Sequence, residues 1–439
     1  MERSVRPFHR KPAFSYPVIV RAKGSHLWDS HGNRYLDATS GALVANIGHG
    51  RREVAEAAAR QIRQLDFVHG SQFSSEPFEQ LAAALTPFAP EGAWRFFAVS
   101  GGSEATESAL KLARQVQLER GDAERTIIVS RSTGYHGASL GALAASGLGS
   151  RRDPYEPMIN TAAFEKISSP RPGDTAQTQL AEFEHLLDRL GAHRIAALML
   201  EPVIGAASPG LASPAGTYEA FRALCDKHGI LLIFDEVMSG LGRCGRPLAL
   251  DHWDAVPDVV VLGKGLGAGY APLAGILVSE QVVNDISLGS GSFRHGFTYA
   301  GHPVSAAVGI EVLRILSEEK LVELAERSGT RLQSELKRLQ IRHPELHAVR
   351  GYGLLIGLLF GPPGETHPFK RPGYAYTLKE AALEVGLNTY PGTGSEPGGL
   401  GDHLLIGPPL NASTEDLTEL VEKLDTALVL AKARLEGYC

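Results

Sequence analysis

The feature that most constrains this chain is a series of short apolar runs separated by stretches of helical character. The runs begin near residue 94 and are FFAVS, TIIVS, IAALML, ILLIF and VVVL. They are apolar at successive positions, which is typical of parallel strands that helices cover on both faces. The pattern therefore predicts an α/β fold with a mostly parallel central sheet flanked by helices.

Each of these runs ends in a polar or glycine-rich group of residues. In open α/β sheets, ligands bind outside the carboxyl ends of the strands. We therefore expect the five groups to meet at one site. In chain order they are residues 101–104, Tyr135 with His136, Glu201, Asp235 and Lys264.

The rest of the chain predicts a smaller α+β domain built from both termini. Residues 18–37 contain three short strand-like runs with turn signals between them, typical of an antiparallel meander. After residue 305 we expect two helices, one strand over GYGLLIGLLF, a loop over 361–373, and an amphipathic helix from about Glu415. The predicted division is 1–60 and 326–439 for the small domain and 61–325 for the large domain.

Composition and charge argue against several classes of protein. The net charge of -6 gives no basic surface for nucleic acid, and no apolar run is long enough to span a membrane. The basic N-terminus lacks a following apolar stretch, which argues against a secretory signal. Three cysteines without paired spacing predict neither disulfides nor a metal site, and favour a cytoplasmic location.

Lys264 and Asp235 indicate the chemistry of the expected site most directly. Lys264 follows VVVL, where burial disfavours the ammonium form and frees the amine to form an imine with an aldehyde. Asp235 follows ILLIF, and a carboxylate at the end of a buried strand needs a partner such as a protonated pyridine nitrogen. Taken singly, an exposed loop lysine and a helix-capping aspartate are the alternatives.

The segment SGGSEATESALKLARQ predicts a helix start that can bind a phosphate. Gly101 and Gly102 allow close approach to the free backbone N–H groups, and Ser103 adds a hydroxyl. The spacing matches neither an ATP-binding nor a dinucleotide-binding loop, and a helix start without a ligand is the alternative. Glu107 and Lys111 are expected to form an ion pair one helical turn apart.

The residues after TIIVS allow two interpretations. The ring of Tyr135 can stack on a planar cofactor or pack in the core. Residues 137–141, GASLG, match the G-x-S-x-G motif of α/β hydrolases, with Ser139 as nucleophile. That motif needs a strand that runs directly into the serine, whereas TIIVS ends about nine residues earlier, so a serine hydrolase is the weaker interpretation.

Several ordered segments together resemble the class III aminotransferases, which are fold-type I pyridoxal-phosphate (PLP) enzymes. The resemblance implies a large PLP-binding domain, a smaller domain and a homodimer with shared active sites, with a tetramer left open. It also implies ping-pong transfer of an amino group from an amine or amino-acid donor to a keto-acid acceptor. The segments are SGGSEATESALKLAR, STGYHGASLGAL, LMLEPV, LLIFDEVMSGLGRCG, VVLGKGLGAGYAPLAG and FRHGFTYAGHP.

The resemblance also implies roles for individual residues. Lys264 would hold the cofactor as a Schiff base, and Asp235 would pair with the pyridine nitrogen. Val237 and Tyr135 would pack on opposite faces of the ring, and Thr298 would reach the phosphate in the neighbouring subunit. Lys264 and Asp235 are thus the expected catalytic residues. The expected cofactor-binding residues are Gly101, Gly102, Ser103, Tyr135, His136, Glu201, Asp235, Val237, Lys264 and Thr298.

Two departures from the family pattern concern the substrate. Ornithine-like members carry an arginine just before the late Pro-Pro pair, but this chain has residues 404–407, LLIG, there. Arg152, Arg294 and Arg371 are candidate replacements that the sequence does not separate. Met238 stands where many relatives have glutamine. The remaining alternatives are an aminomutase, racemase or decarboxylase on the same scaffold, and a cofactor-free binding protein.

Overall fold

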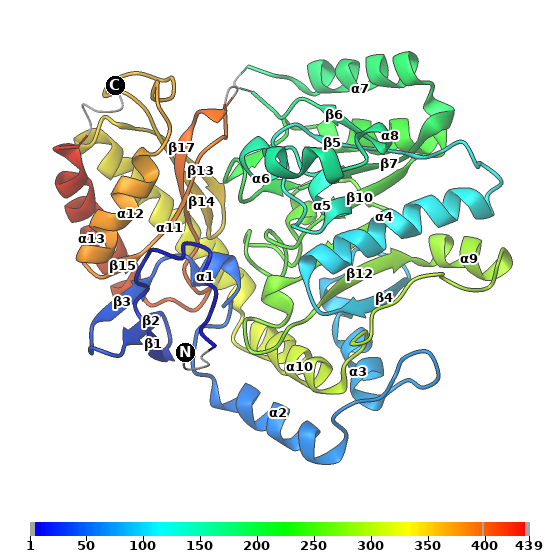
Figure 1. Cartoon of the computed structure of the whole chain (residues 1–439), viewed down its shortest axis with the longest axis horizontal. Coiled ribbons are helices and arrows are strands. Elements are labelled where there is room, and N and C mark those ends of the chain that lie inside the picture. The colour runs from blue at the N-terminus through cyan, green and yellow to red at the C-terminus, as the bar shows by residue number, and fades with distance from the viewer. Residues whose placement is uncertain (1–4, 172, 397–398, 435–439) are drawn as a thin grey trace.

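The computed structural model describes residues 5–171, 173–396 and 399–434. Figure 1 shows a large sheet with its helices, coloured cyan to yellow-green, beside a smaller part that contains the blue N-terminal and the orange to red C-terminal segments. The chain thus leaves the smaller part early and returns to it late.

The central sheet of the larger part contains seven strands within the described residues. Neighbouring strands pair in parallel except β12, which is antiparallel to both of its neighbours. The prediction of a mostly parallel sheet is therefore confirmed, although the sequence pattern did not predict β6 or β12. In order across the sheet, the strands are β4 (Trp94–Val99), β12 (Ala274–Ser279), β11 (Val259–Leu262), β10 (Leu231–Asp235), β7 (Ile195–Leu200), β5 (Ile127–Arg131) and β6 (Phe164–Ile167).

Helices cover both faces of this sheet, as the unbroken apolar runs predict. Ile233 and Val261 pack in one apolar cluster with α4 and α9, whereas the next residues, Phe234 and Leu262, pack in another with α7, α8 and α10. Burying each of these side chains contributes about 1.5–3 kcal/mol. The helices are α4 (Gly102–Glu119), α7 (Ala176–Leu190), α8 (Thr217–His228), α9 (Glu280–Leu288) and α10 (Pro303–Glu318).

The smaller part joins the two ends of the chain through a four-stranded sheet. The predicted meander is present as β1 (Ile19–Lys23), β2 (His26–Asp29) and β3 (Arg34–Asp37), paired antiparallel. The C-terminal strand β15 (Leu387–Asn388) pairs in parallel with β3. This pairing brings the termini into one layer, while the limits at residues 60 and 325 stay a prediction.

A second sheet corrects one prediction, because the expected single strand over 351–360 is the second half of a hairpin. The chain turns at Gly353, whose φ is 50°, a conformation that favours glycine. The predicted loop over 361–373 and the closing helix are present. The sheet has the order β13 (Leu346–Tyr352), β14 (Leu355–Phe360), β17 (Asp402–Ile406) and β16 (Tyr390–Gly392), and its helices are α11 (Leu321–Arg342), α12 (Tyr374–Glu384) and α13 (Thr414–Lys432).

Shorter elements connect these layers. Cys225 and Cys244 are buried free thiols, and Cys439 lies outside the described residues. No helix in the part of the chain that the structure describes combines the length and hydropathy needed to cross a membrane. The remaining elements are α1 (Ser40–Leu43), α2 (Arg52–Gln64), α3 (Glu76–Ala84), α5 (Leu140–Ala145), α6 (Gly149–Arg152), β8 (Val203–Ile204) and β9 (Leu211–Ala212).

Candidate active site

The polar groups at the carboxyl ends of the strands meet at one place, as expected from the sheet. Ser103 follows β4, and its Oγ accepts a hydrogen bond of 2.9 Å from the backbone N–H of Ala138. Tyr135 follows β5, and its backbone N–H donates to Oε1 of Glu201, which follows β7, at 2.9 Å. These contacts join segments that are 35 and 66 residues apart in the chain.

Lys264 begins a tight turn (Lys264–Leu266) directly after β11, with φ of 40°. A positive φ is strained for a residue other than glycine, and such strain often occurs at functional sites. Burial lowers the pKa of the Lys264 amine to about 8, although the carboxylates of Asp235 and Glu201 oppose the shift. A much larger fraction of this amine is therefore unprotonated near neutral pH than in an ordinary lysine.

Asp235 is the last residue of β10, and a buried histidine, His136, holds its side chain in place. Its Oδ2 lies 2.7 Å from Nδ1 of His136, and its Oδ1 accepts the backbone N–H of Val237 at 3.0 Å. Both side chains are almost completely buried, and Nε2 of His136 has no hydrogen-bond partner. The pair thus presents an oriented carboxylate in a desolvated site, where its charge acts strongly.

Glu201 is a second buried carboxyl group in the site. Besides the N–H of Tyr135, it accepts the N–H of Gly205 through Oε2 at 2.9 Å. Burial raises the pKa of Glu201 to about 7; nearby His136 opposes this rise and Asp235 adds to it. Glu201 can therefore gain or lose a proton near neutral pH while it orients the backbone at Tyr135.

The start of α4 has the features expected of a phosphate cradle. Gly101 precedes the helix, and no side chain caps it. A Cβ on Gly101 would meet no atom within 4 Å, so open space lies before the first turn. A Cβ on Gly102 would meet Cγ1 of Val237 at 3.0 Å, so the backbone approaches that side chain closely. Free N–H groups facing open space suit a phosphate.

Val237 and Tyr135 are placed to contact a flat ligand near Lys264. Val237 lies close to Gly102 and to Gly263, the residue before Lys264. Tyr135 packs beside Met238 in an apolar cluster at the domain boundary. Apolar and aromatic side chains beside a buried amine and carboxylate fit a planar heteroaromatic aldehyde.

Thr298 lies in the loop after α9, and its side chain is exposed. It lines a cavity of about 960 Å³ together with Val68, Phe73 and Phe97. None of the other predicted site residues lines this cavity. Its expected role requires a second subunit.

The family model described as aminotransferase class-III matches residues 9–428. The chain belongs to the class III aminotransferases. It is therefore a transaminase, and neither the aminomutase, racemase and decarboxylase alternatives nor the hydrolase is favoured.

Individual relatives agree over nearly the full length of this aminotransferase. It is 40% identical over 437 residues to the uncharacterized aminotransferase YodT of Bacillus subtilis, covering 97% of this chain and 98% of the relative. A transaminase from the marine bacterium Virgibacillus matches with TM-score 0.91 and 30% identity, covering 98% and 97%. A PLP-bound amine transaminase from an uncultivated Pseudomonas species matches with TM-score 0.88 and 31% identity, covering 98% and 99%. The family and its PLP-bound member imply PLP chemistry.

Glu107 of the aminotransferase corrects a local prediction. Instead of pairing with Lys111, its Oε1 accepts hydrogen bonds from Ser139 Oγ at 2.7 Å and from the N–H groups of Gly141 at 2.9 Å and Ala142 at 3.2 Å. Glu107 thereby caps α5, because tertiary contacts to three donors outweigh one exposed ion pair. The Ser139 hydroxyl takes part in this cap by donating to the Glu107 carboxylate.

The sequence did not predict two further residues near the site, Thr106 and Arg151. Thr106 Oγ1 donates to the backbone carbonyl of His136 at 2.7 Å. Its position three residues after Ser103 places it on the same helix face, a signal that could have found it. Arg151 lies over the ring of Tyr135, with its guanidinium carbon 4.5 Å from the ring centroid. No local pattern distinguishes Arg151 from Arg152.

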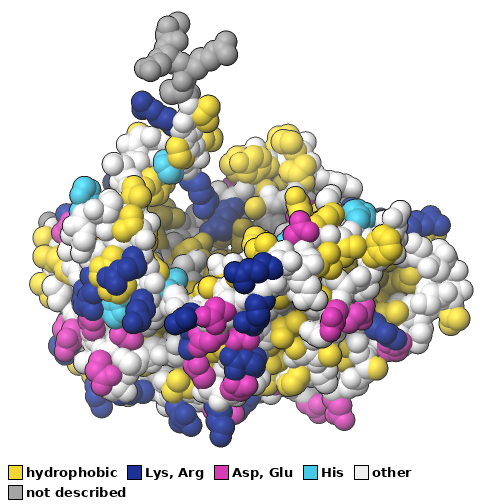
Figure 2. Space-filling model, turned by 90° about the horizontal axis from the view of Figure 1, so that it is seen from below, with side chains coloured by type: hydrophobic (Ala, Val, Ile, Leu, Met, Phe, Trp, Pro, Cys, Tyr) yellow, Lys and Arg dark blue, Asp and Glu magenta, His cyan; other side chains and the backbone are white. Residues whose placement is uncertain are grey.

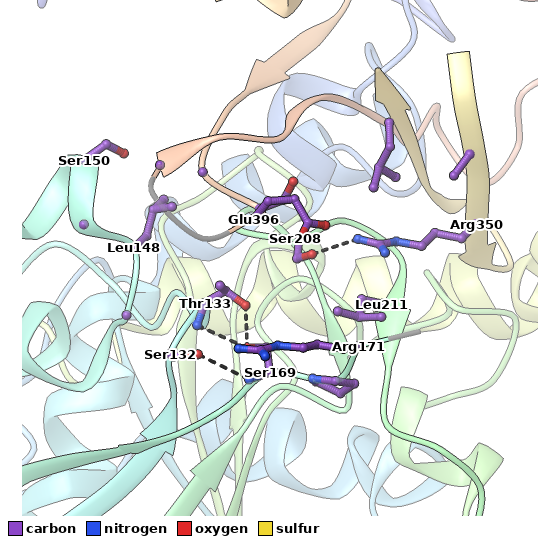
Figure 3. Close-up of a pocket in the computed structure, with 18 of the residues that line it drawn as sticks. Ser132, Thr133, Leu148, Ser150, Ser169, Arg171, Ser208, Leu211, Arg350 and Glu396 are labelled. Atoms are coloured by element: carbon purple, nitrogen blue, oxygen red, sulfur yellow. Dashed lines mark hydrogen bonds between the residues drawn. The ribbon is translucent and has the colours of Figure 1, made fainter. Parts of the chain in front are cut away.

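A cavity of about 800 Å³ adjoins the site between the two parts of the molecule (Figure 3). Figure 3 shows Arg350 reaching toward Ser208, to whose Oγ it donates at 2.7 Å. Leu148 and Leu211 line the cavity and pack in the same apolar cluster as Tyr135, so the cavity borders the site at that residue. Hydroxyl groups of Thr133, Ser169 and Ser208 contribute to its wall.

Proposed function

We propose that this aminotransferase holds PLP on Lys264 and uses it to move an amino group from an amine or amino-acid donor to a keto acid. The observation that carries the proposal is the state of the Lys264 amine. Burial lowers its pKa to about 8, and the nearby Asp235 carboxylate opposes that shift. A neutral amine beside an oriented carboxylate is what capture of an aldehyde with a basic ring nitrogen requires.

The described residues fit each part of the cofactor. Gly101, Gly102 and Ser103 at the start of α4 would hold the phosphate, and Val237 and Tyr135 would contact the ring. Asp235 would pair with the ring nitrogen. When bound, PLP supplies an aldehyde for the amino group and a ring that withdraws electrons from the substrate carbon.

The chain's own groups then control the protons. Nζ of Lys264 would take a proton from the substrate carbon as a neutral amine and give a proton back as an ammonium group. Asp235 would pair with the ring nitrogen, and Nδ1 of His136, 2.7 Å from its Oδ2, fixes the carboxylate. Glu201 and Thr106 hold the backbone of residues 135 and 136, which sets the position of the Tyr135 ring.

We further propose a homodimer in which Thr298 reaches the phosphate bound by the partner subunit. Two large apolar side chains near Thr298 are exposed, Phe73 at 63%, which lines the same cavity, and the adjacent Tyr299 at 59%. Figure 2 views the molecule from below and shows hydrophobic side chains in several exposed groups among charged ones. Exposed apolar groups of this kind mark contact surfaces. Light scattering on the purified protein tests the dimer and the possible tetramer.

The buried free thiols of Cys225 and Cys244 support a cytoplasmic location, where thiols stay reduced.

Borohydride trapping tests the proposed function directly. The purified protein should be yellow, and an amine donor should remove the colour until a keto acid restores it. Reduction with borohydride followed by peptide mapping should place the cofactor on Lys264. A colourless protein, or a modification on another lysine, would refute the proposal. Labelling of Ser139 by a fluorophosphonate would support the hydrolase instead.

A further inference from the structure

Arg151 carries a charge that the protein itself does not neutralise. Its side chain is half-buried, and its Nη2 donates to the hydroxyl of Tyr390 at 3.3 Å. Among the described residues, no Asp or Glu oxygen lies within 4.0 Å of its guanidinium group, whereas neighbouring Arg152 pairs with Glu156 at 3.8 Å. A partly desolvated cation without a carboxylate partner favours an anionic ligand.

The position of Arg151 directs this charge toward the site. Its guanidinium group lies over Tyr135, which we propose contacts the cofactor ring. Tyr390 and Tyr135 belong to one apolar cluster that also contains Met238. The positive charge of Arg151 also contributes to the lowered pKa of Lys264. Arg151 therefore acts on the same space as the reacting amine.

The geometry leaves donor groups of Arg151 available. A guanidinium group has five N–H donors, and stacking on an aromatic ring occupies its face without occupying its edge. Tyr390 accepts from one nitrogen only. The remaining edge can bind a carboxylate through two parallel hydrogen bonds.

Two other arginines nearby, Arg350 and Arg243, are already engaged by the chain itself. Arg350 donates to the carbonyl of Pro209 at 3.1 Å and to Ser208 Oγ at 2.7 Å. Arg243 is fully buried and donates to the carbonyl of Pro408 at 2.6 Å and to Oδ1 of Asn46 at 2.8 Å. These bonds tie segments of the chain together, so both side chains serve the fold.

We propose that Arg151 binds the carboxylate of the substrate in this aminotransferase and thereby selects amino-acid and keto-acid substrates over simple amines and aldehydes. The inference rests on the proposed function of Lys264. Binding of the substrate carboxylate would thus fall to α6. Residues 404–407, LLIG, contain no arginine that could do so.

The test compares substrates that differ only in the carboxylate. Loss of the yellow colour is followed for the holoenzyme with alanine against isopropylamine, β-alanine against propylamine, and 4-aminobutyrate against butylamine. Return of the colour is followed with pyruvate against acetaldehyde. The variants are Arg151→Leu, Arg151→Lys and, as a control on the same helix, Arg152→Leu. The yellow colour of each variant verifies that it folds and binds the cofactor.

Arg151→Leu should lower kcat/KM for the carboxylate-bearing member by about 10- to 100-fold in at least one half-reaction, the loss expected for a charge-assisted hydrogen bond. The matched compound without a carboxylate should react as in the wild type. Arg151→Lys should recover part of the loss, and Arg152→Leu should keep the wild-type ratios.

Equal changes for both members of every pair, or no change, would overturn the inference and leave Arg151 as a support for Tyr135. The proposed function fails separately, if the wild-type protein does not change colour with any donor.

Discussion

Two half-buried lysines lie at the same sheet, and they differ in what surrounds the amine. Lys264 follows β11 near Asp235 and Glu201, and no described residue accepts a hydrogen bond from its amine. Lys166 lies within β6 and donates to Ser130 Oγ at 2.7 Å, to the carbonyl of Ala144 at 3.0 Å and to that of Ala145. Burial lowers the pKa of both amines, to about 8 for Lys264 and about 7 for Lys166.

The comparison teaches that a lowered pKa records burial and does not by itself mark a catalytic lysine. The three donors of Lys166 have three acceptors, so its amine joins β6 to the end of α5. The Lys264 amine has carboxylates nearby and no such acceptors. Reactivity therefore depends on whether the amine is free to reach a ligand.

Replacing the two lysines gives the largest expected contrast. Lys264→Ala should lower the transamination rate by about a thousandfold or more, because both the bond to the cofactor and the proton-transfer group are lost. Its thermal unfolding midpoint should not fall, since a costly buried amine is removed. Steady-state assays and thermal unfolding check both statements. Substantial activity in Lys264→Ala would break the comparison.

The carboxylate near Lys264 gives the next largest effect. Asp235→Asn should lower kcat by about 100- to 1000-fold, the cost of removing one preorganised electrostatic group. Glu236→Gln is a matched control, because Glu236 is adjacent and buried but its carboxylate is bonded to Ser239 and to the N–H of Leu250. It should keep most of the activity. Similar losses in both variants would mean that burial of any acid in this segment matters.

The pH dependence of cofactor capture separates the two amines further. Only the neutral form of Lys264 attacks an aldehyde, so the rate at which PLP-free protein captures PLP should fall about tenfold per pH unit below its pKa. The rate should level off above about pH 8, where burial has placed that pKa. Lys166→Met should leave the profile unchanged, and a shift in that variant would contradict the assignment.

The smallest expected effect on activity belongs to Lys166. Lys166→Met should keep activity but lower stability by about 1–3 kcal/mol, because the carbonyls of Ala144 and Ala145 lose a buried donor. The pKa of Lys166 is about 7 in the fold against 10.5 ordinarily, so the unfolded chain binds more protons between those values. This group therefore adds stability as pH rises from 7 to 10.5. Denaturant unfolding should show that rise reduced in the variant.

The sequence was most informative where the functional residues follow the ends of strands. Lys264, Asp235 and Glu201 could be placed together because each ends an apolar run, and parallel strands bring such ends to one edge. It was weaker where partners come from elsewhere in the chain. The partners of Glu107 belong to α5, and the single strand expected over 351–360 hides a turn at Gly353.

The sequence by itself determined the α/β core, the position of the candidate site and the family, because unbroken apolar runs and the residues that follow them are local properties of the chain. Only the tertiary structure decided that β3 pairs with β15, that Lys166 is fully bonded, and that Arg151 lies over Tyr135. These contacts join separate segments that meet only after the layers have packed, and no local pattern specifies which side chains will then be neighbours.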